Sequence, residues 1–222
     1  MIKPWMFVHS QVRFPFDENL VGYWYFNEGK GGIAYDRSGY GNDGTLVNME
    51  AADWVDGVVG KALDFDGTNE YVNCGNDASI QVDTAGSVSL WVRLEADKWC
   101  YAFDKGYKLN GGLTIGYYSS WRKRWLSTTY HDGYNYVYFG TPVLNEWTHL
   151  VVTYADNTLT YYVNGEYSIS DSWEYGILTS GQDLLIGGLS RLWQGSIDEV
   201  RIYSTALTAS EVKALYLYPG GK

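Results

Sequence analysis

Apolar and polar residues alternate along much of the chain, and this period of two is typical of strands with one buried face. In residues 87–94, SVSLWVRL, every second residue is aliphatic. Residues 158–170 contain the dipeptide Asn164-Gly165, which is a strong signal for a two-residue hairpin. Further strands are predicted, from β-branched and aromatic content or glycine punctuation, over residues 147–154, 183–188 and 195–203.

One segment, residues 208–216, predicts a helix instead. Thr208 and Glu211 form a capping box, and Val212, Leu215 and Tyr216 would then share one face. With strands about every 8 to 15 residues, the chain is all-β. The predicted fold is a two-sheet antiparallel β-sandwich or jelly roll with one short C-terminal helix.

The first segment of the chain looks different from the rest. Residues 1–19 are predicted to be an N-terminal arm or an extra edge strand, placed before a single domain of residues 20–222. The opening run MIKPWMFVHSQVRF has one Lys, an early Pro and a brief apolar stretch, which does not match a secretory signal.

Composition and charge narrow the function. The 222 residues include 21 Tyr and 10 Trp, which suit strands and also wet binding surfaces. A net charge of −10 argues against a nucleic-acid partner, because such binding needs a basic surface. No apolar run approaches the roughly 18 residues of a membrane span, so membrane insertion is not expected. Cys74 and Cys100 are expected to be free and buried, since their spacing does not show that they meet.

Residues 36–45, DRSGYGNDGT, form a polar and flexible stretch after an aromatic-rich segment. The glycines match the G-x-G-x-x-G pattern of a dinucleotide site, but no helix pattern follows and Asp43 would repel phosphate. Two interpretations stay open. Gly, Asn and Asp build compact loops unaided. Alternatively, Asp36 and Asn42 supply side-chain oxygens for a Ca²⁺ ion, which prefers such hard ligands.

Several motifs occur in an order that resembles one family, the laminin G-like (LamG-like) jelly roll of the concanavalin A-like lectin/glucanase superfamily. The motifs cover about residues 20–217 and are LVGYWYFNEGKGGIAYDRSGYGNDGTL, GKALDFDGTNEYVNCG, SVSLWVRL, NEWTHLVVTYADNTLTYYVNGE and GSIDEVRIYSTALTASEVKALY. The resemblance implies two curved antiparallel sheets packed face to face. It says little about function, because the family includes lectins, carbohydrate-binding modules, adhesion domains and modules of viral surface proteins.

The same resemblance implies a structural calcium ion near the loop of residues 36–45, close to the acidic residue of the closing strand. Carried over to this sequence, it nominates Asp36, Asn42 and Asp198 as ligands, with Asp66 and Glu28 as outer candidates. On this hypothesis, chelation of calcium lowers the melting temperature.

The sequence carries no recognised catalytic motif. His9, His131 and His149 have no metal-pair spacing, and there is no G-x-S-x-G nucleophile elbow. Glucanase relatives carry an E-x-D-x-x-E strand motif that is absent here. Asp198 and Glu199 are adjacent, which on a regular strand directs them to opposite faces. We therefore expect no enzyme activity. A glycosidase or polysaccharide lyase, with carboxylates from distant strands, is the last of the alternatives.

Residues 116–140 are strongly aromatic and hold the basic run Arg122-Lys123-Arg124. They predict hairpins with tips near SSWRKR and HDGYN. Sugars stack their apolar faces on Trp and Tyr rings, while arginines can bind carboxylate or sulfate on an acidic polysaccharide. The family pattern does not contain this hairpin, and strand alternation directs part of its rings into the core. The candidate ligand-binding residues are Trp121, Arg122, Arg124, Trp125, Tyr130 and Tyr134.

Together these patterns predict a non-catalytic, lectin-like carbohydrate-recognition module with a structural calcium, located extracellularly or on a virion surface. The alternative is a structural or adhesive surface protein of a virion or appendage. It would bind a protein partner, or a second copy of itself, through the N-terminal arm. A virion protein needs no signal peptide, because assembly or lysis releases it.

Overall fold

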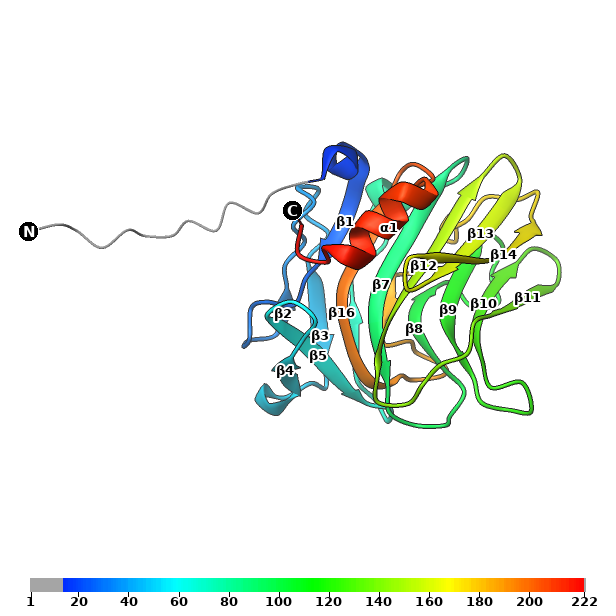
Figure 1. Cartoon of the computed structure of the whole chain (residues 1–222). Helices are drawn as coiled ribbons and strands as arrows, with labels where there is room; N and C mark the ends of the chain where they lie inside the picture. Colours follow the sequence, from blue (N-terminus) through cyan, green and yellow to red (C-terminus); the bar gives the residue numbers. More distant parts are fainter. Residues whose placement is uncertain (1–13, 222) are drawn as a thin grey trace, which may run out of the picture.

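Two antiparallel sheets packed face to face form the body of the protein (Figure 1). The computed structural model describes residues 14–221. The residues 1–13 of the predicted N-terminal arm therefore lie outside the described part of the chain. The two-sheet sandwich predicted from the alternating pattern is confirmed.

Sheet A has the strand order β14-β13-β12-β7-β16-β5-β4, and β1 pairs with β16 beside this path. Its strands are β1 (Leu20–Trp24), β4 (Trp54–Asp56), β5 (Lys61–Asp66), β7 (Gly86–Leu94), β12 (Trp147–Ala155), β13 (Thr158–Val163), β14 (Glu166–Ser172) and β16 (Gln194–Tyr203). The predicted hairpin at Asn164-Gly165 is confirmed, because both residues have positive φ angles (52° and 75°) and connect β13 to β14.

Sheet B has the order β11-β10-β9-β8-β15-β6-β3-β2. Its strands are β2 (Ile33–Ala34), β3 (Gly44–Val47), β6 (Tyr71–Asn73), β8 (Cys100–Lys105), β9 (Gly112–Tyr118), β10 (Arg124–Tyr130), β11 (Tyr134–Phe139) and β15 (Leu185–Ile186). The aromatic segment forms β9, β10 and β11, with tips at the two predicted places. The strand predicted over residues 183–188 is shorter than expected, because positive φ angles at Gly187 and Gly188 end it after Ile186.

The core lies between the sheets and is built from the inward residues of both. In β7 the aliphatic residues Val88, Leu90, Val92 and Leu94 are fully buried, as their spacing predicted. The indole rings of Trp125 and Trp193 stack in this core, with ring centroids 6.4 Å apart. Cys74 and Cys100 are both buried and free, so this prediction is confirmed.

Helix α1 (Ala209–Leu217) covers part of the outer face of sheet A (Figure 1). The predicted capping box is present, since Glu211 N–H donates to Thr208 Oγ1 and Thr208 N–H donates to Glu211 Oε2. The helix buries Val212 and Leu215, and Tyr216 stacks on Trp91 with ring centroids 5.6 Å apart.

The 3₁₀ helix η1 (Pro15–Asn19) also contributes to this outer layer. Phe14 and Phe16 are buried, and the Phe16 ring lies 5.9 Å from that of Tyr203. The last residues of the predicted arm therefore pack onto the domain. Two further 3₁₀ helices, η2 (Ala51–Asp53) and η3 (Ala78–Ile80), lie in connections. No helix within residues 14–221 is long and apolar enough to cross a membrane.

A β-bulge interrupts β16 at the acidic pair. Asp198 pairs with Trp91 and Arg201 pairs with Ser89, so two residues of β16, Glu199 and Val200, lie opposite one residue of β7. The extra residue lets Glu199 bond the outward side chains of Tyr23 and Arg201. The expectation that Asp198 and Glu199 point to opposite faces was therefore wrong, because the bulge breaks the regular alternation.

Candidate functional site on the outer face of sheet B

The outer face of sheet B presents a band of aromatic rings. In β11, alternation directs Tyr134, Tyr136 and Tyr138 outward, while Val137 and Phe139 enter the core. Tyr134 and Tyr136 keep 39% and 36% of their surface exposed. From Tyr134 to Tyr138 the band extends about 14 Å along the strand at the usual rise of an antiparallel strand.

Ring contacts connect this band from one end of the strands to the other. Tyr107, in the loop after β8, lies 5.8 Å from Tyr134 and 5.2 Å from Tyr101, measured between ring centroids. At the opposite end, the Tyr118 ring lies 4.8 Å from Trp99 and 5.4 Å from Tyr138. The two groups are joined by Trp99 and Tyr101, whose ring centroids lie 6.5 Å apart.

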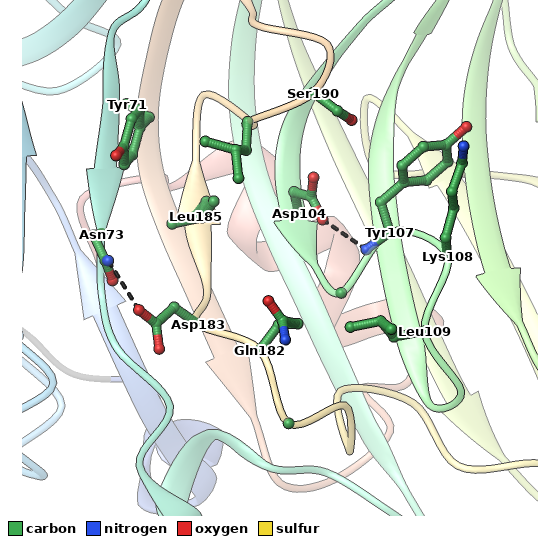
Figure 2. A pocket seen from close by; sticks show the side chains of 13 residues that line it. Tyr71, Asn73, Asp104, Tyr107, Lys108, Leu109, Gln182, Asp183, Leu185 and Ser190 are labelled. Carbon is green, nitrogen blue, oxygen red and sulfur yellow. Dashed lines mark hydrogen bonds between the residues drawn. The ribbon is translucent and has the colours of Figure 1, made fainter.

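A cavity of about 560 Å³ opens on this face beside Tyr107 (Figure 2). In Figure 2, Asp104 and Leu185 lie between two walls, one formed by Tyr71 and Asn73 and the other by Tyr107, Lys108 and Leu109. The exposed side chains of Leu109 and Leu189 add apolar surface at its lining. The site thus combines aromatic and aliphatic surface with polar groups.

The polar groups of the cavity are held by hydrogen bonds. Asn73 Nδ2 donates to Asp183 Oδ2 at 2.9 Å, and Tyr107 N–H donates to Asp104 Oδ1 at 2.9 Å (Figure 2). Burial raises the pKa of Asp104, against the opposing effect of backbone N–H donors. These amide and carboxylate groups can accept and donate hydrogen bonds to a polar ligand.

Lys105 fixes the loop that carries Gln182 and Asp183. Its buried ammonium donates to the backbone carbonyls of Ser180 and Gln182 and to Asn76 Oδ1. Burial lowers the pKa of Lys105 to about 8, because the charged form loses its hydration. Lys105 therefore positions one side of the cavity and does not itself face the solvent.

The residues predicted from the aromatic hairpin fall largely on this face. Tyr130 and Tyr134 form one ring pair, with centroids 5.1 Å apart. Trp121, Arg122 and Arg124 line a second, smaller cavity of about 380 Å³ with Tyr138. The prediction that Trp125 contacts a ligand was wrong, because Trp125 is fully buried and points inward against Tyr117 and Trp193.

Sequence reasoning did not find the larger cavity. Its lining comes from β6, β8, β15, the loop after β8 and the loops on both sides of β15, which are far apart in the chain. No short motif joins Asn73, Asp104 and Asp183. The only signal was the high Tyr and Trp content, which does not say where the rings meet.

The residues nominated for calcium do not form one ligand set. Asp36 and Asn42 are neighbours, but Asp198 accepts from the backbone N–H groups of Val58 and Val59, and Asp66 accepts from Thr68 N–H. Within residues 14–221, no three His, Cys, Asp or Glu side chains gather to hold a metal.

The Asp36 carboxylate is moreover occupied by donors from the protein. Oδ1 accepts from the backbone N–H groups of Tyr23 and Ser38, and Oδ2 accepts from Ser38 Oγ and Asn42 N–H. These hydrogen bonds already compensate the negative charge of the Asp36 carboxylate, which a Ca²⁺ ion would need for its coordination. These residues do not fit the ion, and the loop is closed by hydrogen bonds. Glu28 instead lies near Arg37, at 3.6 Å.

The acidic pair of β16 is not accessible to a substrate. Asp198 and Glu199 are fully buried, and Glu199 bonds Tyr23 and Arg201. Burial, reinforced by the neighbouring Glu199, raises the pKa of Asp198 to about 8. Three backbone N–H groups oppose this shift and hold the side chain in place. These contacts give the pair a structural role.

Comparison with known families identifies the domain. A laminin G-type family profile described as the concanavalin A-like lectin/glucanases superfamily matches residues 66–213, which is more than half of the chain. No curated protein matches the sequence significantly.

Solved structures with the same fold include binding domains of larger proteins. Domain 4 of AbnA, a GH43 extracellular arabinanase from Geobacillus stearothermophilus in complex with arabinotriose, is similar with a TM-score of 0.73 and 23% identity. The alignment covers 89% of this chain and 98% of that domain. The binding domain of Paraclostridial Mosquitocidal Protein 1 has a TM-score of 0.72 and 18% identity, over 90% of this chain and 52% of that one.

The receptor-binding domain of botulinum neurotoxin D is also similar, with a TM-score of 0.70 and 15% identity over 92% of this chain and 54% of that one. This chain thus spans about half the length of the two toxin domains. At these identities the likenesses establish the shared fold.

Proposed function

We propose that this chain, which belongs to the concanavalin A-like lectin/glucanases superfamily, binds carbohydrate without catalysis through the outer face of sheet B. The observation that carries the proposal is the cavity beside Tyr107, where an aromatic band meets fixed amide and carboxylate groups. A sugar ring has apolar C–H faces and a polar rim, and this combination of surfaces complements both.

The arrangement of the cavity supports binding rather than hydrolysis. Asp104 is buried and accepts from Tyr107 N–H, while Asp183 is exposed and accepts from Asn73 Nδ2, so the two carboxylates are held separately and can still accept hydrogen bonds from a sugar. Glycoside hydrolysis needs two carboxyl groups that face each other across the scissile bond. The arabinotriose bound to the domain of AbnA makes arabino-oligosaccharides a reasonable first ligand to test.

Isothermal titration calorimetry against a panel of neutral oligosaccharides and polysaccharides, beginning with arabino-oligosaccharides, tests the proposal. We expect saturable binding that Tyr107→Ala weakens by roughly tenfold or more, the range of a lost aromatic contact at a binding site. Tyr167→Ala is the matched control, because Tyr167 is 62% exposed and lies on β14, in the other sheet.

Equal weakening by both variants would contradict the assignment to this face. An absence of glycan binding by the folded wild-type protein would instead favour the surface-module alternative. Release of reducing sugar from any member of the panel would contradict the non-catalytic part of the proposal.

A further inference from the structure

The arginines divide into two groups by location and pairing. Arg37, Arg93 and Arg201 each lie near a carboxylate, of Glu28, Glu95 and Glu199 respectively. Within residues 14–221, Arg122, Arg124 and Arg191 have no such partner within 4.0 Å. All three belong to the aromatic band of sheet B or to its margin.

The lack of a carboxylate partner for these three arginines is unexpected in a chain with a net charge of −10, where carboxylates outnumber cations. The neighbouring Lys123 shows that a carboxylate is within reach of this tip, because its Nζ lies 2.5 Å from Asp97 Oδ2. Asp97 also accepts from Tyr117 O–H. The carboxylate at this tip is thus used by Lys123, and the two flanking guanidinium groups remain available.

Arg122 contacts two aromatic rings. Its guanidinium carbon lies 4.2 Å from the centroid of Trp121 and 4.3 Å from that of Tyr138. Contact with two aromatic rings restricts this side chain, and a guanidinium that lies over a ring keeps its N–H donors for other partners. A guanidinium prepared in this way suits bidentate contact with a planar carboxylate or a sulfate.

Trp121 gives this place an additional surface for a sugar. Its side chain is 78% exposed, and together with Arg122, Arg124 and Tyr138 it lines the cavity of about 380 Å³. A large exposed indole beside unpaired guanidinium groups matches a ring that carries both an apolar face and an anionic substituent.

Arg191 places a third guanidinium further along the band. Its guanidinium carbon lies 3.4 Å from the centroid of Trp99, which itself contacts Tyr101 and Tyr118. The cations are thus distributed along the ring contacts that lead from Trp121 to the larger cavity. A polymer with repeated anionic groups could contact more than one of them.

We propose that the Trp121–Arg122–Arg124 cavity is an anion-binding subsite that makes the protein selective for acidic polysaccharides carrying carboxylate or sulfate groups. This inference rests on the proposed carbohydrate binding and specifies its ligand class. The overall negative charge disfavours nucleic acid, whose binding needs many phosphate contacts. The guanidinium groups beside Trp121 suit a polymer that brings an anion and a stackable ring together.

Affinity measurements with matched pairs of polysaccharides test the inference. One pair is polygalacturonate and its fully methyl-esterified form, and the other is dextran sulfate and dextran. We expect wild-type protein to bind an acidic member about tenfold more tightly than its neutral partner in low salt, with the preference reduced by salt screening. The two pairs distinguish carboxylate from sulfate recognition.

The double variant Arg122→Gln/Arg124→Gln should remove most of this preference, so that the acidic and neutral members of each pair bind with similar affinity. Lys123→Gln is the matched control, since it removes a neighbouring charge that is already paired with Asp97. We expect Lys123→Gln to have a smaller effect on the preference than the double variant. Unchanged melting temperatures would show that these exposed substitutions leave the fold intact.

The outcomes separate the two proposals. Glycan binding without preference for the acidic members would overturn this inference and leave the proposed function standing. A preference that survives in the double variant, or that is lost equally in Lys123→Gln, would also overturn it. If the wild-type protein binds neither neutral nor acidic polysaccharides, both proposals fail.

Discussion

Neighbouring tryptophans can have opposite roles, and Trp121 and Trp125 illustrate this. Trp121 is largely exposed on the tip between β9 and β10, whereas Trp125 is fully buried and stacks on Trp193. The sequence predicted both as ligand contacts. The alternation of side chains along the strand did not show that Trp125 points inward. The residues that share its face include the polar residues Ser127 and Thr129, so this face did not look like a core face in the sequence.

The two tryptophans should therefore respond differently to truncation. We expect Trp125→Ala to lower the free energy of unfolding by about 3 to 5 kcal/mol, the cost of removing a large buried ring. Trp121→Ala should change it by about 0.5 kcal/mol or less, while weakening glycan binding. Urea unfolding monitored by circular dichroism measures both. Comparable destabilisation by the two variants would contradict their assigned environments.

His149 is a buried group whose titration should affect stability. It lies under α1, bonds Ser89 Oγ at 2.9 Å and stacks near Trp91 and Tyr216. Burial, with a smaller contribution from nearby Arg201, lowers the pKa of His149 from 6.5 to about 3. The neutral form is therefore favoured by the folded state.

This depressed pKa predicts a loss of stability in acid. The contribution of neutral His149 to the free energy of unfolding is fully present above about pH 6.5. It falls as the pH decreases toward about 3, because the unfolded chain then binds a proton that the folded chain does not. We expect a loss of about 3 kcal/mol between pH 6.5 and pH 4 from this residue. Unfolding free energies of wild-type and His149→Gln proteins across this range measure it. Parallel profiles for the two proteins would refute the assignment.

At the scale of single elements, α1 was the most predictable part of the fold. Its capping box and its buried face follow from local spacing, and both occur as predicted. Thr208→Ala should lower the free energy of unfolding by about 1 kcal/mol, because Glu211 N–H loses its side-chain acceptor. Thr141→Ala, at an exposed threonine in the loop before β12, is the control and should be nearly neutral. Equal effects of the two would argue against the cap.

For the loop of residues 36–45, the family resemblance implied a calcium site, and the hydrogen bonds of the side chains do not fit one. Asp36 has protein donors on both carboxylate oxygens, and Trp24 Nε1 donates to Asn42 O at 2.8 Å. We therefore expect the same melting temperature in excess EDTA and in calcium chloride. A clearly lower melting temperature in EDTA would restore the calcium hypothesis drawn from the sequence.

For the whole molecule, the sequence predicted the sandwich because period-two segments such as residues 87–94 are local signals. The bulge at Asp198 and the larger cavity were not predictable in this way. The bulge depends on pairing between β16 and β7, and the cavity joins Asn73, Asp104 and Asp183 from distant segments. Of the six residues predicted from the aromatic hairpin, only Trp125 lies in the core, because composition locates the tips of a hairpin but not the face on which each ring lies.

The central claim is that the outer face of sheet B is where carbohydrate binds. Mapping backbone amide shifts by NMR, during titration with the glycan that binds most tightly in the calorimetric panel, tests this location directly. We expect the largest shifts to cluster at Tyr107, Gln182 and Tyr134, with little change in α1 or residues 36–45. Shifts concentrated on the loop of residues 36–45 or on sheet A, or no shifts with any glycan, would contradict it.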